Sequence, residues 1–539
     1  MKNILRLIST VAFMVCVFCL KPATGFALDP VTDTGPISEP ALAIKNNRVE
    51  MPLKSVLLLG LKNNLNIQFA SYTPGITETG IQLEEGKFDT LLSTQYQKNR
   101  SVTQTGNALG STSSPVVKEE RHNWEGKLQK KFLTGTQAEL KTTNEEYLTD
   151  TSFQGLKPQF KNTIALSLTQ PLLKDFGIGI NETFIKIANL NYETSEYEFR
   201  DQVMNVMYQI EAFYWDLYYR NQDLLAKQDS LKQAEELQRE FKIRIEAGAL
   251  APIEIHQADA NVAQRKQEVI VAQAAVQAAE DYLKAALNLY DQKEYWDIEI
   301  FPSDLPNVIN IKPSVDDCVK TAFENRPDLK QAQLGIRASE LQLKYAKNQK
   351  LPNLSLFGSM GTSGIAGTPS STAGVFGPFY QGTKSPYNGQ WDKARSEMLS
   401  GDFYNYVIGV KFEVPIENNI AKSQYQKARL QSEQAVTNMK SVENIVINDV
   451  REALRRLDTS YKVIDSATAN LTFTKEKLWA EQKKYEVGMS TARDVLDFQR
   501  DVAQAKSTLA LAKSEHSKSI VNLSRVTGVL IEQKGLQYK

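Results

Sequence analysis

Residues 478–497 have the sequence LWAEQKKYEVGMSTARDVLD, and residues 238–257, QREFKIRIEAGALAPIEIHQ, correspond to them at an offset of 240. In both stretches a helical pattern stops at a glycine, Gly248 or Gly488, and resumes a few residues later. Glycine just past a helix end adopts a left-handed backbone that ends the helix. Each stretch therefore predicts the tip of a helical hairpin, with Gly248 and Gly488 at the turns.

The same offset relates longer parts of the chain. It superposes Leu217 on Leu457, Leu224 on Ile464, Leu231 on Leu471 and Ile245 on Tyr485. Self-similarity at one fixed offset is the mark of an internal repeat. A heptad seam supports long helices on either side of the first tip, and its members are Phe199, Val203, Val206, Ile210, Phe213 and Leu217. The segment Asn181 to Ala247 predicts one helix roughly 100 Å long.

We interpret the chain as two copies of a unit built from a helix, strands and a long helical hairpin. The first copy spans residues 49–290, with a helix at Leu53–Leu65, strands at about 87–170 and a helical hairpin at 181–290. The second copy spans residues 315–530, with a helix at Val315–Asn325, strands at about 353–415 and a helical hairpin at 418–530. The remaining predicted segments are a signal peptide (1–27), an N-terminal linker (28–48), a linker (291–314) and a C-terminal tail (531–539).

Two strand segments alternate apolar and polar residues with a period of two. On one face of the later segment lie Tyr406, Ile408, Val410 and Phe412, and on one face of the earlier segment lie Ile164, Leu166 and Leu168. The runs have about the length that a membrane-spanning strand needs. A half-buried strand of a soluble protein has the same pattern, so the strands alone leave both interpretations open.

The regions beside these strands give weaker signals. Residues 121–147 predict an extra hairpin that turns at Thr134-Gly135-Thr136, and the sequence leaves open whether its strands join the same sheet. Gly358–Asp402 is rich in Gly, Ser, Thr and Tyr, which predicts a long loop.

Composition narrows the classes of protein further. Lys and Arg total 63 and so do Asp and Glu, which argues against a general nucleic-acid binder. Lys2 and Arg6, an apolar run from Leu7 to Leu20 and the small residues of Gly25-Phe26-Ala27 predict a secretory signal peptide. Its removal would leave 60 basic and 63 acidic residues and one thiol, Cys318, so no disulfide can form within the chain.

Five segments in combination resemble the TolC-like outer-membrane efflux protein family, from about Val49 to Gly528. They are Asn325–Leu329, Lys350–Leu354, Val410–Pro415, Leu168–Leu173, and Tyr485–Gly488 with Asp494–Asp497. The resemblance implies a mixed α and β membrane protein with a duplicated strand–strand–helical hairpin unit. In this family three chains form one outer-membrane β-barrel that continues into a periplasmic α-helical coiled-coil tunnel.

The resemblance also implies a function and a gate. The function would be an exit duct in the outer membrane of a Gram-negative bacterium, for efflux or type I secretion, with a periplasmic extension. The expected partners are two further copies of the chain, outer-membrane lipid, a periplasmic adaptor and an inner-membrane transporter. Asp494 and Asp497 match the acidic gate positions of the family, and Tyr485 and Glu254 match a pair that holds neighbouring tip helices together.

No catalytic, cofactor or metal pattern emerges from the sequence. His122, His256 and His516 lack the spacing of metal ligands, and Cys318 has no His or Cys partner nearby. We therefore expect no enzyme activity, no cofactor and no resident metal. The alternatives that remain are a periplasmic adaptor and a structural coiled-coil protein of the envelope.

Overall fold

The computed structural model describes residues 48–104, 116–151, 154–248, 251–370 and 385–535. The predicted signal peptide and nearly all of the N-terminal linker lie outside these residues. The described residues fold into two compact units. The sheet unit takes those within 78–190 and 337–434, and the helical unit takes those within 48–77, 191–336 and 435–535. Each unit takes residues from both predicted repeats, so neither repeat is a compact unit by itself.

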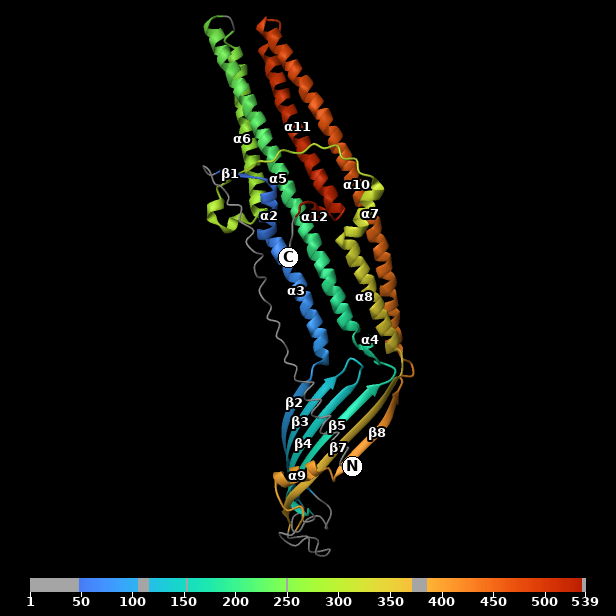
Figure 1. Ribbon diagram of the computed structural model, residues 1–539. Helices are drawn as coiled ribbons and strands as arrows, with labels where there is room; N and C mark the ends of the chain where they lie inside the picture. The colour runs from blue at the N-terminus through green and yellow to red at the C-terminus, as the bar shows by residue number, and fades with distance from the viewer. Residues whose placement is uncertain (1–47, 105–115, 152–153, 249–250, 371–384, 536–539) are drawn as a thin grey trace. The chain divides into compact units, whose positions relative to one another are not determined.

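The sheet unit contains one antiparallel sheet of six strands in the order β2-β3-β4-β5-β7-β8 (Figure 1). The strands are β2 (Leu91–Gln104), β3 (Val116–Lys131), β4 (Gln137–Thr149), β5 (Leu156–Pro171), β7 (Asn353–Pro369) and β8 (Tyr404–Glu413). The sheet of one chain is open, with β2 and β8 at its edges. The predicted extra hairpin is β3–β4, and it lies inside the sheet between β2 and β5.

The sequence predicted a loop over Gly358–Asp402, and this prediction is wrong at both ends of the range. β7 continues to Pro369, and α9 (Trp391–Ser400) packs on β5 and β7. The glycines permit this close approach, because a Cβ on Gly364 would lie 2.0 Å from the carbonyl oxygen of Ala394 in α9. A glycine that suggested a loop is thus required where α9 packs against β7.

The helical unit is built mainly from two helical hairpins (Figure 1). The first is formed by α5 (Thr183–Glu246) and α6 (Glu254–Ala286), and the second by α10 (Asn419–Glu486) and α11 (Ala492–Val526). The predicted seam of α5 is confirmed: Val203, Val206, Ile210 and Leu217 are buried in the main core, and Phe199 and Phe213 pack against it. Burial of this apolar stripe, not helix propensity alone, stabilises such long helices.

Shorter elements complete the structure. They are α2 (Leu53–Asn63), α3 (Leu65–Glu85), α4 (Ile178–Asn181), α7 (Val315–Asn325), α8 (Pro327–Gln349) and α12 (Leu530–Gln533). The predicted linker 291–314 includes a strand, β6 (Glu299–Pro302), which pairs in parallel with β1 (Arg48–Met51). Three single-turn 3-10 segments (Gly86–Phe88, Leu289–Asp291 and Lys293–Tyr295) account for the other short elements.

Candidate functional site at the helical tips and the strand face

Both hairpins of the helical unit turn at the predicted glycines. Gly248 has φ +71° and Gly488 has φ +78°. Their N–H groups donate to equivalent carbonyls, those of Ile245 at 2.9 Å and Tyr485 at 3.1 Å. A Cβ at either glycine would meet no atom within 4 Å, so the left-handed backbone, and not lack of space, is what requires glycine here.

Asp494 lies in the first turn of α11, the second helix of the second hairpin. Its carboxylate accepts hydrogen bonds from the backbone N–H and the hydroxyl of Thr491, and its own N–H donates to that hydroxyl. These contacts form a capping box at the start of α11. The hydrogen bonds from Thr491 lower the pKa of the Asp494 carboxyl. Asp494 is exposed, so its negative charge faces the surroundings of the chain.

Asp497 lies one turn further along α11 and forms an ion pair with Arg500 at 3.3 Å. Both side chains are about half exposed, and such a pair contributes little to stability. Asp494 and Asp497 are three residues apart on one helix, so they share a face. These two residues therefore place two carboxylates on one face of α11 near the tip.

Tyr485 and Glu254 are not hydrogen-bonded to each other within the chain. Glu254 is the first residue of α6, while the Tyr485 ring packs in a tip cluster of apolar residues, with the Arg244 guanidinium 4.9 Å from its centroid. In the described part of the chain the buried Tyr485 hydroxyl has no hydrogen-bond partner. Burial raises the pKa of this phenol.

The strand residues singled out in the sequence meet on one face of the sheet. By register, Leu166 lies opposite Met360, which lies opposite Tyr406, and Leu168 is linked in the same way through Gly358 to Ile408. Val410 and Phe412 continue this face along β8. We call it the apolar face. Sequence reasoning missed Leu92, Leu128 and Leu140, which extend this face over β2, β3 and β4, because charged residues interrupt the alternation there.

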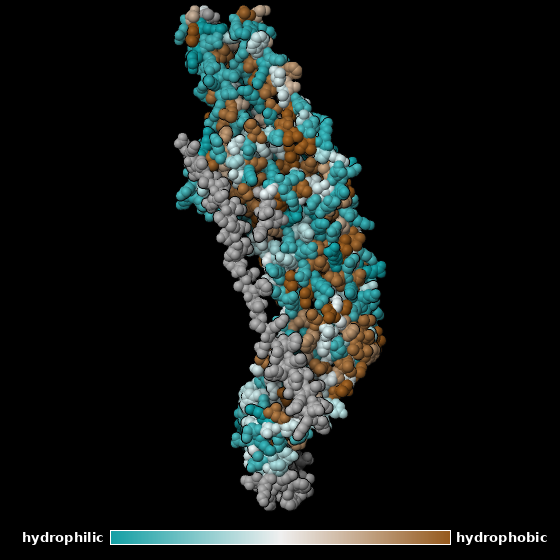
Figure 2. Space-filling view, viewed as in Figure 1, coloured by the Kyte–Doolittle hydropathy of each residue, from teal (hydrophilic) through white to brown (hydrophobic). Residues whose placement is uncertain are grey.

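Exposed apolar side chains gather at the β8 edge. Figure 2 shows hydrophobic surface gathered where β8 ends and the segment before α10 begins. The exposed apolar residues there are Phe412, Val414, Ile416 and Ile420. Large exposed apolar patches mark contact with lipid or with another protein.

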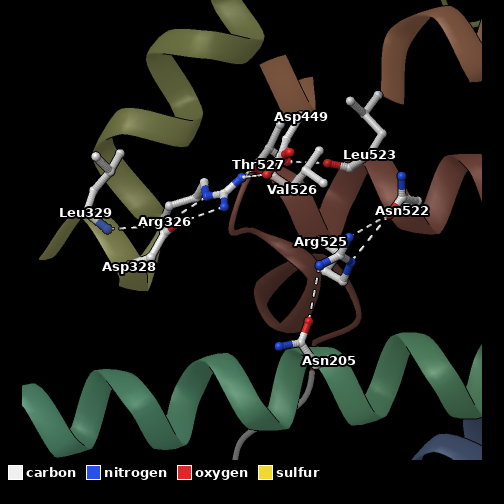
Figure 3. Close-up of polar contacts among 10 residues, drawn as sticks. All are labelled: Asn205, Arg326, Asp328, Leu329, Asp449, Asn522, Leu523, Arg525, Val526 and Thr527. Carbon is white, nitrogen blue, oxygen red and sulfur yellow. Dashed lines mark hydrogen bonds and ion pairs between the residues drawn. The ribbon is translucent and has the colours of Figure 1, made fainter. Parts of the chain in front are cut away.

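The turn between α7 and α8 contains a partly buried arginine (Figure 3). Arg326 Nη2 lies 2.7 Å from Asp328 Oδ2, and Nη1 lies 2.9 Å from Asp449 Oδ2 on α10. The same Nη1 donates to the carbonyl of Val526 at the end of α11. Burial opposes the charge, yet the two carboxylates raise the pKa of Arg326 above its ordinary value. One side chain thus ties three helices of the helical unit together.

A buried charge lies on α6. Glu280 is 7% exposed, and burial raises its pKa to about 7 despite the nearby Lys284 ammonium. Lys284 is also buried, and its Nζ donates to the Trp296 carbonyl at 3.0 Å. This pair lies among core residues far along the helix from the tip, so we assign it to stability and not to transport.

The raised pKa of Glu280 predicts a pH dependence of stability. Between about pH 4.5 and pH 7 the folded protein keeps the proton that the unfolded chain has released. The free energy of unfolding should therefore fall as pH rises through this range. Thermal unfolding at several pH values should show this decline in the wild type and a weaker decline in Glu280→Gln. Glu236→Gln, at an exposed glutamate on α5, is the control and should keep the wild-type slope.

His516 and Cys318, two further residues that could bind a metal or react, are each packed within the helical unit. His516 is buried, with Nδ1 2.9 Å from Ser460 Oγ and Nε2 3.2 Å from the Ile309 carbonyl. Cys318 is half-buried, and burial raises its pKa. Among the described residues, no three His, Cys, Asp or Glu side chains come together as a metal site. Of the helices in the same residues, none is both long and apolar enough to cross a membrane.

The chain is similar in sequence to known outer membrane proteins. A family model described as outer membrane efflux protein matches residues 318–529. The outer membrane protein TolC of Escherichia coli is 25% identical over 257 residues, which cover 48% of this chain and 47% of that protein. The TolC of Salmonella enteritidis is 23% identical over 378 residues, covering 69% of this chain and 70% of that one. The match thus spans about half the length of the first relative.

The fold also matches a solved structure. The outer membrane channel CmeC of Campylobacter jejuni superposes with a TM-score of 0.62 at 16% identity, and the match covers 90% of each chain. At this identity the likeness concerns the fold.

Proposed function

We propose that three copies of this chain form an exit duct in the outer membrane, because a family model described as outer membrane efflux protein matches residues 318–529. In this proposal the duct extends into the periplasm and works with a periplasmic adaptor and an inner-membrane transporter. It would serve efflux or type I secretion, with the energy and the choice of cargo supplied by the transporter.

The observation that carries this proposal is the open sheet with one apolar face. β2 and β8 are long edge strands, of 14 and 10 residues, whose outer backbone groups lack a strand partner in the described part of the chain. Soluble proteins shorten or shield such edges, because bare edges pair with other chains. Pairing of β8 with β2 of the next copy would satisfy both edges, and the apolar face would then contact lipid.

A second observation supports contact between copies in the helical unit. Leu65, Phe69 and Tyr72 on α3 are each more than half exposed. Their spacings of four and three residues are those of a coiled-coil seam, which buries such side chains against another helix. A neighbouring copy would supply that helix.

The native mass of the extracted protein tests the assembly. We expect the protein in the outer-membrane fraction, extractable only with detergent, with the mass of a trimer. A monomer or dimer released without detergent would overturn the proposal and favour an adaptor or a structural coiled-coil protein.

The proposed gate is the set of tip residues Asp494, Asp497, Tyr485 and Glu254. Three copies of each aspartate would form rings of negative charge, which attract cations and restrict passage. The buried, unpaired hydroxyl of Tyr485 supports a movable tip, since leaving such a group without a partner costs about 1–3 kcal/mol. A tip rearrangement that brings an acceptor such as Glu254 to this hydroxyl would recover that cost.

Neutralising the two aspartates should change conduction. Asp494→Asn with Asp497→Asn keeps an oxygen that can accept the capping hydrogen bond of Thr491, so the change is mainly one of charge. In planar bilayers we expect a higher single-channel conductance and a cation preference several-fold weaker than in the wild type.

Asp465→Asn, an exposed change on α10 distant in sequence from the tip, is the control and should leave both properties unchanged. Equal conductance and selectivity in the double variant and the wild type would place the constriction elsewhere.

A further inference from the structure

The β3–β4 hairpin is an integral part of the sheet. β3 pairs with β2 from Leu91↔Gln129 to Gln104↔Val116, and β4 pairs with β5 from Gln137↔Thr169 to Tyr147↔Gln159. Without the hairpin, β2 would lose its only strand partner among the described residues. The hairpin is therefore not an appendage of a smaller sheet.

One row of the sheet shows that the hairpin shares the apolar face. Following the register from edge to edge, each strand contributes one large apolar side chain to this row. The six residues are Leu92, Leu128, Leu140, Leu166, Met360 and Tyr406. Leu128 and Leu140 belong to the hairpin and lie between residues of β2 and β5. An uninterrupted apolar row suits a surface in contact with hydrocarbon.

Away from this row the apolar face of the hairpin also bears charged residues, which are Lys118, Glu120, Lys130 and Glu146, whereas the opposite face is charged at the level of the row itself. Lys127 Nζ lies 3.2 Å from Glu139 Oε2, and Lys141 Nζ lies 2.9 Å from Glu125 Oε2. These four residues all lie on the face opposite Leu128 and Leu140, because neighbouring residues of a strand alternate between faces. In the row next to the apolar one, Lys127 and Lys141 line up with Ser93, Ala165, Gly361 and Asn405. This polar face needs water beside it.

We propose that the β3–β4 hairpin spans the membrane within the duct wall, and that its two Lys–Glu pairs line the water-filled lumen. The inference rests on the proposed trimer, in which three six-stranded sheets closed edge to edge make a wall of eighteen strands. Closed sheets of about 16–18 strands enclose an aqueous channel, whereas about eight strands leave an interior filled by side chains. The lumen at this level would therefore admit hydrated, water-soluble cargo.

The lining also bears on selectivity. On its polar face the hairpin carries four basic residues (Arg121, Lys127, Lys131 and Lys141) and four acidic ones (Glu119, Glu125, Glu139 and Glu145), so it brings no net charge to the lumen. The hairpin would then add no preference for either sign of charge to the lumen, and selection by charge would depend on residues elsewhere, such as the tip carboxylates.

Cysteine labelling tests the position of the hairpin. In a Cys318→Ser background, Leu140→Cys and Thr143→Cys place thiols on the two faces of β4. Leu166→Cys and Thr163→Cys place matched thiols on β5, because Leu140 lies opposite Leu166 and Thr143 opposite Thr163. The trimer in lipid vesicles is treated with a charged, membrane-impermeant thiol reagent. We expect Thr143→Cys and Thr163→Cys to react at least about tenfold faster than Leu140→Cys and Leu166→Cys.

The β5 pair separates the two possible failures. If the β5 thiols differ in reactivity but Leu140→Cys reacts as fast as Thr143→Cys, the hairpin lies outside the bilayer and this inference is wrong, while the proposed duct stands. If Thr143→Cys is as unreactive as Leu140→Cys, the hairpin does not line the lumen, which also overturns it. If the β5 thiols react alike, the lipid-facing sheet fails, and the proposed function fails with it.

Discussion

Arg326→Met should lower the free energy of unfolding of the helical unit by about 2 kcal/mol, since it removes the hydrogen bonds that a partly buried arginine donates to two carboxylates. The Arg326 side chain is 14% exposed and contacts Asp328, Asp449 and the Val526 carbonyl (Figure 3). Methionine has a similar length but cannot donate a hydrogen bond. Thermal unfolding followed by circular dichroism at one heating rate should show the loss as a clearly lower midpoint.

Two further variants identify the cause of the loss. Arg326→Lys keeps the charge but not the planar fork that reaches two carboxylates, so it should lose part of the stability. Arg429→Met removes an arginine whose pair with Glu433 is 58% exposed on both sides, and it should change the midpoint little. Equal midpoints for Arg326→Met and Arg429→Met would contradict the role assigned to Arg326.

The Arg326 site also marks a limit of sequence reasoning. The segment Asn325–Leu329 predicted a turn, and α7 indeed ends at Asn325 while α8 starts at Pro327. Asp449, however, is 123 residues from Arg326 and lies in an ordinary helical stretch. Local patterns reveal turns and caps, but the partner of a partly buried charge depends on tertiary packing.

The first helix shows a similar override of local signals. The sequence predicted a helix over Leu53–Leu65, but the chain breaks at Asn64 and resumes as α3, which contains Pro74. Proline inside a helix removes one backbone hydrogen bond and ordinarily ends the pattern. In the structure, Thr77 Oγ1 lies 2.7 Å from Ser195 Oγ on α5, so contacts with α5 support the helix beyond the proline.

The hairpins and the sheet differ in how far they could be predicted. Seams and turn glycines follow from residues within a few positions of each other, so the tips at Gly248 and Gly488 were predictable. The place of β3–β4 within the sheet was not, because charged residues on the same face as Leu128 and Leu140, namely Lys118, Glu120, Lys130 and Glu146, interrupt the apolar alternation. The resemblance supplied the gate residues, and the assignment of Tyr485 and Glu254 as a pair stays a prediction.

Leu166→Arg should prevent most of the protein from assembling in the outer membrane. Leu166 lies on the apolar face in the row shared by all six strands, where the proposed trimer contacts lipid. Arginine on the lipid face of a membrane-spanning strand costs about 2–4 kcal/mol near the bilayer midplane. Each trimer would contain three such arginines, so this free-energy cost would apply three times. The amount of trimer in isolated outer membranes, measured on unheated gels, should fall several-fold.

Ser167→Arg is the matched control, one residue further along β5. Its side chain lies on the polar face, and Ser167 is opposite Glu139, so the new guanidinium would have a carboxylate within reach. We expect nearly normal amounts of trimer for this variant. Equal loss from both variants would mean that the two faces of the sheet meet the same environment, and a lipid-facing wall would then be excluded. Normal assembly of Leu166→Arg would exclude it as well, because only an aqueous or protein-lined surface could accept that charge without cost.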